Sequence, residues 1–206
     1  LIKDFRKVSE KPIIAIIYTH NHLDHLGGAK VFFDEEYTEI YAQENIIYSL
    51  DNIATTIRPI IFERSSRQFG IPLPEEEIVH QGIGGFLEIN DQSTFGLVRP
   101  NILFDDQMTL KIDDLTLMLA HVPGETDDHL YVWIPEKKVV MVGDNFYRSF
   151  ANLYAIRGTK FRNPMEWVHS LDKIRLLNAE HLVPSHSRPI SGEENVSKAL
   201  TDYRDG

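Results

Sequence analysis

Cysteine is absent from the 206 residues of this chain, which excludes disulfide bonds, thiolate nucleophiles and cysteine-based zinc fingers. Long hydrophobic runs are absent too, since the longest one covers only residues 13–17 and is far too short to span a bilayer. Positive charge is scarce, because 21 Lys and Arg stand against 31 Asp and Glu and give a net charge of −10. We therefore expect neither a general affinity for nucleic acid nor a membrane span.

The remaining composition is that of a globular protein with a core, because 42% of the residues are apolar and 25% are charged. The length predicts one domain, residues 1–206. Periodicity and turn residues predict strands at 12–19, 39–42, 102–104, 108–112, 115–122, 130–134, 139–143 and 181–184, and helices at 29–33, 43–69, 163–177 and 193–203. Pro59 should kink or break the second helix, and residues 70–101 should form a long irregular loop. This order predicts sheets flanked by helices.

Four potential metal ligands lie within six residues: His20, His22, Asp24 and His25. They follow the first predicted strand, at whose end alternate residues project the same way, so His20 and His22 can share one ion. Asp24 and His25 lie on the turn beyond and are placed for a second ion. Imidazole and carboxylate groups suit zinc or iron. The cluster has no evident purpose in folding and predicts a metal centre.

The segment Thr19-His20-Asn21-His22-Leu23-Asp24-His25-Leu26-Gly27-Gly28 resembles the signature of metallo-β-lactamase-fold hydrolases. The resemblance implies an α+β fold, an αββα sandwich with a two-metal site at one edge, here lacking its first strands and belonging to a longer chain. It also implies later ligands at Glu125, Asp144 and His186. Glu125 follows Gly124 where the family usually has a histidine, and Asp144 takes the place of the bridging carboxylate. The implied metal ligands are His20, His22, Asp24, His25, Glu125, Asp144 and His186, around two Zn²⁺ or, alternatively, iron or manganese.

A carboxylate at position 125 is unlike β-lactamases and glyoxalase II-like thioesterases and resembles the alkyl sulfatase branch of the fold. The run Asn152-Leu153-Tyr154-Ala155-Ile156-Arg157-Gly158 is similar to the Asn-Leu-Tyr-x-x-Arg-Gly run of that branch. The branch generally has Glu where Asp144 stands. Because Asp is shorter by one methylene, we expect the second ion to sit differently or to bind less tightly. The resemblance covers roughly residues 12–192.

Two divalent cations and three carboxylates leave the implied site with a charge of +1, which favours a bound hydroxide and an anionic substrate. Arg157 and Arg162 are candidates for binding the anion, because a guanidinium pairs with sulfate oxygens through a planar fork. The alternative for either arginine is a structural ion pair with a carboxylate. Asn152 and Tyr154 are further candidates for substrate binding, although a tyrosine in such a segment is often part of the core.

These residues together predict a metal-dependent hydrolase of sulfate esters, an alkyl or aryl sulfatase that uses hydroxide activated by two metal ions. Asp24, Arg157 and Arg162 would be the catalytic residues, and the substrate would be a small anionic ester with an apolar group. The resemblance implies that residues 82–101 could cover the apolar tail; the alternative is that they latch onto the body of the domain or contact another chain. Two alternatives stay open. One is another hydrolase of the same fold, such as a lactonase, thioesterase or phosphodiesterase, and the other is an inactive metal-binding fragment. Homo-oligomerisation and the cellular compartment are left open.

Overall fold

A small parallel sheet carries the histidine-rich turn. The computed structural model describes residues 2–78 and 96–206, and its first sheet has the order β1-β2-β3. The strands are β1 (Ala15–Ile17), β2 (Glu39–Gln43) and β3 (Ile102–Phe104), all paired in parallel. The helical elements that precede β2 in the chain are α1 (Ile2–Arg6), α2 (Leu23–Leu26) and a 3₁₀ turn at Ala29–Val31.

A six-stranded sheet of order β4-β5-β6-β7-β8-β9 forms the second layer. Its neighbouring strands are antiparallel except for β7 and β8, which run parallel. The strands are β4 (Gln107–Ile112), β5 (Leu115–His121), β6 (Leu130–Ile134), β7 (Val139–Gly143), β8 (His181–Pro184) and β9 (Ile190–Ser191), with a 3₁₀ turn at Pro135–Lys137 between β6 and β7.

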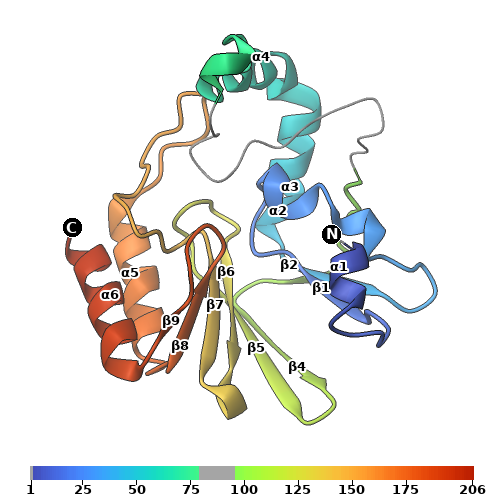
Figure 1. The fold of residues 1–206 in the computed structure, drawn as a ribbon, viewed down its shortest axis with the longest axis vertical. Coiled ribbons are helices and arrows are strands. Elements are labelled where there is room, and N and C mark those ends of the chain that lie inside the picture. Colours follow the sequence, from blue (N-terminus) through green and yellow to red (C-terminus); the bar gives the residue numbers. More distant parts are fainter. Residues whose placement is uncertain (1, 79–95) are drawn as a thin grey trace.

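Three hydrophobic clusters hold the layers together. The cluster between the sheets joins Tyr41 and Phe104 of the first sheet to Leu119, Leu130 and Val132 of the second. On the outer face of the second sheet, α5 (Pro164–Arg175) and α6 (Glu193–Asp205) lie side by side (Figure 1) and bury their apolar faces against β7 and β8. On the outer face of the first sheet, α2 and α3 (Asn45–Asn52) pack on β2. The predicted αββα sandwich is therefore confirmed.

The long helical segment predicted at 43–69 consists of three parts. These are α3, a π-helical turn at Ile53–Ile57 and α4 (Arg58–Gln68), which rises above the sheets (Figure 1). Pro59 lies in the first turn of α4 rather than at a break, because a proline lacks only an N–H that is unpaired there anyway. The irregularity precedes the proline as a widened π turn, a feature that often marks functional sites.

The other predicted elements are found with small shifts at their ends. Three short elements, α1, α2 and β9, were not predicted from the sequence; α2 lies where a turn was expected. Within the predicted loop at 70–101 the structure has a 3₁₀ turn at Glu75–Glu77, and residues 79–95 lie outside the described part of the chain. Over the described residues, no helix has both the length and the apolar character that a membrane crossing needs.

Candidate metal centre

Strand ends bring the seven predicted ligands to one edge of the sandwich. His20 and His22 follow β1, and Asp24 and His25 lie on α2. The other ligands come from the second sheet: Glu125 follows β5, Asp144 follows β7 directly, and His186 follows β8. The two sheets are tied together at this edge, where the backbone N–H of Leu130 donates to the carbonyl of Thr19 over 2.9 Å.

The first group of ligand atoms lies around His20. Its Nε2 is 3.0 Å from Nδ1 of His22 and 3.7 Å from Oδ2 of Asp144. Nδ1 of His22 in turn lies 3.5 Å from Oε1 of Glu125. His20, His22 and Asp144 turn nitrogen and oxygen atoms toward one small volume, in which His20 and Asp144 are almost completely buried. Glu125 contacts this group through His22.

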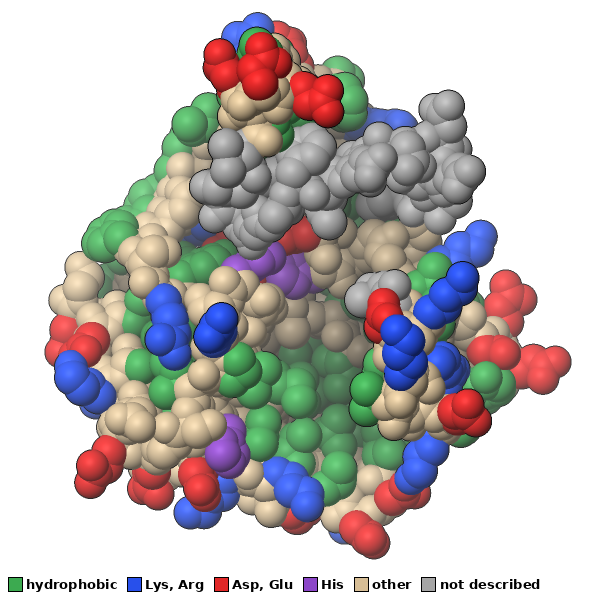
Figure 2. All heavy atoms as spheres, viewed as in Figure 1, with side chains coloured by type: hydrophobic (Ala, Val, Ile, Leu, Met, Phe, Trp, Pro, Cys, Tyr) green, Lys and Arg blue, Asp and Glu red, His purple; other side chains and the backbone are tan. Residues whose placement is uncertain are grey.

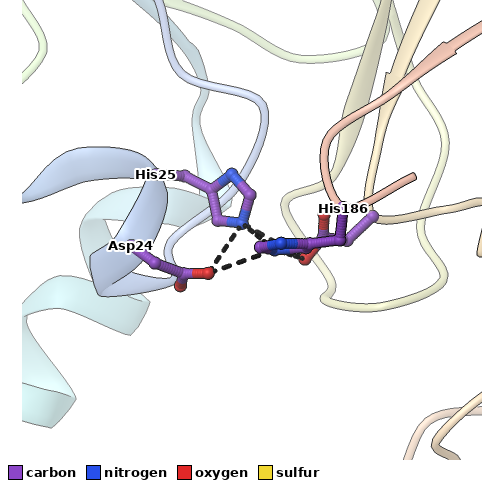
Figure 3. A group of neighbouring side chains, drawn as sticks. Asp24, His25 and His186 are labelled. Atoms are coloured by element: carbon purple, nitrogen blue, oxygen red, sulfur yellow. Dashed lines mark hydrogen bonds and ion pairs between the residues drawn. The ribbon is translucent and has the colours of Figure 1, made fainter. Parts of the chain in front are cut away.

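The second group shares Asp144 with the first and adds Asp24, His25 and His186 (Figure 3). Oδ2 of Asp24 lies 3.2 Å from Nε2 of both histidines, and Oδ2 of Asp144 lies 3.2 Å from His25 and 3.3 Å from His186. The two imidazole nitrogens are 3.3 Å apart. Asp144 thus stands between the two groups.

The spacing of these atoms fits metal ions. Two ligands of a tetrahedral zinc ion with bonds of about 2.1 Å lie roughly 3.4 Å apart. The distances within both groups, from 3.0 Å between His20 and His22 to 3.7 Å between His20 and Asp144, bracket that value. The buried Oδ1 of Asp144 has no hydrogen-bond partner among the described residues, although a buried carboxylate oxygen normally has one. Each of the two groups is therefore spaced as the ligands of a metal ion are.

Protons and metal ions compete for the same atoms in the second group. Hydrogen bonds to Asp144 and Asp24 raise the pKa of His186 to about 10. Burial lowers the pKa of His25, but the same two carboxylates outweigh burial and raise it to about 9. In the first group, burial lowers the pKa of His22 to about 3 and raises the pKa of Glu125 to about 7, although Arg162 opposes the second shift.

Two buried residues hold the ligands in place, and sequence reasoning did not assign either of them. His129 is stacked on His20 with ring centroids 4.8 Å apart, and its Nε2 accepts a hydrogen bond from the backbone N–H of Asp144 over 3.1 Å. Oδ1 of Asn145 accepts from the backbone N–H of Glu125 over 3.0 Å. Proximity to the ligands in the sequence was the available signal, since Asn145 directly follows Asp144. Such partners orient the ligands of metal sites.

A cavity of about 810 Å³ opens onto these ligands. Figure 2 shows histidine side chains near the centre of the face on which it lies. The segment from Tyr147 to Arg162 forms one side of the cavity and reaches α4 (Figure 1), where Oε1 of Gln68 accepts from the backbone N–H of Arg157 over 3.0 Å. The apolar part of its lining comes mainly from the π-helical turn, α4 and three phenylalanines: Ile53, Ile57, Ile61, Phe69, Phe150 and Phe161.

The predicted substrate-binding residues take different positions around this cavity. Arg157, Arg162 and Asn152 line it, whereas Tyr154 is 56% exposed and lies outside its lining. Nη2 of Arg157 lies 3.0 Å from Nε2 of His22. Arg162 is buried and forms an ion pair with Glu125, with 2.5 Å between Nη2 and Oε1. Asn152 offers its carbonyl oxygen to Arg162 and its Oδ1 to the backbone N–H of Tyr154.

Comparison with known proteins agrees with this geometry. Residues 2–186 match the family described as the metallo-beta-lactamase superfamily. A linear primary-alkylsulfatase of Pseudomonas sp. (strain ATCC 19151) is 38% identical over all of this chain and 40% of its own length. The alkyl/aryl-sulfatase BDS1 of Saccharomyces cerevisiae is 26% identical over 98% of this chain and 32% of its own length. This chain thus spans two fifths or less of both relatives.

The solved structure of the stereoselective inverting sec-alkylsulfatase Pisa1 from Pseudomonas sp. has a similar fold. Its TM-score is 0.89 at 24% identity, over 99% of this chain and 34% of that one. A metallo-beta-lactamase family protein from Thermus thermophilus gives a TM-score of 0.62 at 18% identity, over 93% of this chain and 59% of that one.

Proposed function

Because this chain belongs to the metallo-beta-lactamase superfamily, we propose that it carries the metal site of a hydrolase of sulfate esters. The observation that carries the proposal is the ligand set, in which a buried glutamate, Glu125, faces His22. The similarity to a linear primary-alkylsulfatase along the whole chain supports the same substrate class. The relatives are much longer than this chain, so the proposal concerns the chemistry of the metal site and not the activity of a whole relative.

Seven side chains would hold two metal ions. We expect His20, His22 and Glu125 on one ion, Asp24, His25 and His186 on the other, and Asp144 between them. When bound, two Zn²⁺ ions would act as Lewis acids and lower the pKa of a water molecule toward neutrality. Iron or manganese would suit the same nitrogen and oxygen donors. Asp24 is the most exposed carboxylate of its group, so it also faces the cavity as a candidate catalytic residue.

Arg157 is suited to bind the sulfate group. A guanidinium carries only hydrogen-bond donors, so its contact with His22 requires the Nε2 atom of that imidazole to accept. The proton of His22 is then on Nδ1, the atom that faces His20 and Glu125. If Nδ1 of His22 binds an ion instead, Nε2 keeps the proton and Arg157 loses this acceptor. The guanidinium then becomes available to an anion in the cavity.

The apolar wall of the cavity suits the alcohol part of the substrate. Ile53, Ile57 and Ile61 lie one helical turn apart on the π-helical turn and α4, and all three are half-buried cavity residues. Phe150 and Phe161 line the cavity as well. Each methylene group that leaves water against such a wall contributes about 0.8 kcal/mol. We therefore propose an alkyl ester of sulfate, with Asn152 beside its polar end. Tyr154 remains a candidate only if its exposed side chain turns inward.

The test is the release of inorganic sulfate from a linear alkyl sulfate, measured on the zinc-loaded chain beside an aryl phosphate, a thioester and a lactone. We expect sulfate release from the alkyl sulfate, and we expect the His22→Ala variant to lose it while keeping its circular dichroism spectrum. Turnover of the thioester or lactone without sulfate release would overturn the proposal in favour of another hydrolase of this fold. Two bound ions without any turnover would favour an inactive metal-binding domain.

A further inference from the structure

Two side chains, the buried Arg162 and the half-buried Tyr147, hold the carboxylate of Glu125 from both sides. Nη2 of Arg162 lies 2.5 Å from Oε1, and the hydroxyl of Tyr147 donates to Oε2 over 3.0 Å. The side chains of Arg162 and Glu125 are only 4% and 5% exposed. Both charges are therefore shielded from water, and the ion pair lies in the interior, where Glu125 is itself a proposed metal ligand.

Stability gives little reason for such a pair. Burying two charges costs several kcal/mol per ion, and a buried ion pair contributes at best about as much as apolar side chains of the same size. The arginine is nevertheless fixed at further points, since Nη1 donates to the carbonyl of Asn152 and its backbone N–H donates to the carbonyl of Leu153. A guanidinium that is held this firmly is suited to orient the group that it contacts.

The contacts with Arg162 and Tyr147 leave some lone pairs of the Glu125 carboxylate unoccupied. An ionised carboxylate has about four lone-pair sites on its two oxygens, and Arg162 and Tyr147 each occupy one. Oε1 also lies 3.5 Å from Nδ1 of His22, so a free lone pair of that oxygen is available on the side of His22. The backbone of Glu125 is fixed separately by Asn145.

We propose that Arg162 and Tyr147 are positioning residues that hold the Glu125 carboxylate toward His20 and His22, where the three residues bind one ion. The inference rests on the proposed metal site and is independent of the substrate. It gives Arg162 a partner in the protein, Glu125, in place of the sulfate group expected from the sequence. It also assigns a role to Tyr147, which the sequence did not single out.

The test compares zinc binding in four variants: Arg162→Gln, Arg162→Lys, Tyr147→Phe and the control Arg99→Gln. Arg99 forms an exposed ion pair with Asp51 and does not line the cavity. Zinc content after dialysis and a competition titration with a chromophoric chelator give the number and affinity of the ions. Cobalt substitution, followed by visible absorption, reports the ligand field of each site. None of these measurements depends on sulfatase activity.

We expect Arg162→Gln to weaken one of the two ions by about 10–100-fold, the usual effect of losing a partner of a metal ligand, and to leave the other unchanged. Tyr147→Phe should weaken the same ion by a smaller factor, because the Arg162 contact remains. Arg162→Lys should restore part of the loss because it keeps the charge, and Arg99→Gln should bind both ions like the parent.

Two results would overturn the proposal. One is unchanged affinity for both ions in a folded Arg162→Gln variant. The other is an equal loss at both ions, which would indicate general destabilisation. If Arg162→Gln does not fold, Tyr147→Phe decides the matter. This variant keeps the ring that stacks on His186 with centroids 6.3 Å apart, so weakening of one ion supports the proposal and unchanged binding of both contradicts it.

Discussion

Gly124 precedes Glu125 in a crowded turn, so adding one methyl group there should disturb the metal site. A Cβ atom at this position would lie 2.5 Å from Oδ1 of Asn145 and 2.9 Å from two ring atoms of Trp167. Neither neighbour can move freely, because Asn145 and Trp167 are buried and Nε1 of Trp167 donates to the Asn145 carbonyl over 3.0 Å. The same Oδ1 atom holds the backbone N–H of Glu125.

The size of the effect follows from these contacts. Overpacking costs about 1–3 kcal/mol, and loss of the Asn145 hydrogen bond to Glu125 adds about 1 kcal/mol. The reduced freedom of the unfolded chain returns about 0.4–1 kcal/mol. We expect Gly124→Ala to lower the free energy of unfolding by about 1–3.5 kcal/mol and to weaken the ion beside Glu125.

Urea unfolding of the metal-free chain, followed by circular dichroism, measures the loss. The matched control is Gly28→Ala, because Gly28 has a φ of −100° and a Cβ atom there would meet nothing within 4 Å. This control should be as stable as the parent or slightly more stable. A Gly124→Ala variant with parental stability and zinc affinity would refute the reasoning, and so would an equal loss in both variants.

Three further predictions concern the substrate and the metal ions. Arg157→Gln should lower kcat/KM for alkyl sulfates by about 30-fold, since exchanging charged for neutral hydrogen bonds to an anion costs about 2 kcal/mol. An unchanged zinc content of the variant shows that its metal site is intact, and kinetics equal to those of the parent would contradict the role of Arg157. Zinc affinity should rise with pH up to about 10, because the raised pKa values of His25 and His186 keep both imidazoles protonated at neutral pH and binding must release these protons. Calorimetry in buffers of different ionisation enthalpy counts the released protons, and a count of zero would refute the expectation. Ile57→Asn should lower kcat/KM for long-chain alkyl sulfates more than for short-chain ones. The control Phe62→Asn, on the exposed side of α4, should lower neither. An equal loss for all chain lengths would contradict the binding of the alkyl chain by the apolar wall.

The candidate ligands could be predicted because they occur in recognisable local patterns at the ends of predicted strands. His20 and His22 alternate at the end of a strand, and Asp144 directly follows the apolar strand β7. The order of these residues along the chain did not by itself bring them together, because β1 and β7 belong to different sheets. Asp144 was assigned to the same site through the resemblance to a known family. The αββα fold could be predicted from the same pattern of strands and helices, together with the resemblance to a known family.

The surroundings of the ligands could not be predicted in the same way. Arg162 was assigned to the anion because a guanidinium pairs equally well with sulfate and with carboxylate, and only the fold brings it to Glu125. Tyr147 carries no local signal, since its contacts with Glu125 and His186 both depend on the tertiary structure. The π-helical turn before Pro59 was missed because helical periodicity does not distinguish a widened turn from a regular one.

The most direct test of the metal site is a crystal structure of the zinc-loaded chain with anomalous diffraction at the zinc edge. We predict two anomalous peaks. One lies among His20, His22 and Glu125, the other lies among Asp24, His25 and His186, and Asp144 contacts both. A single peak, or two peaks with Glu125 or His186 turned away from them, would contradict the proposed ligand set and the reaction built on it.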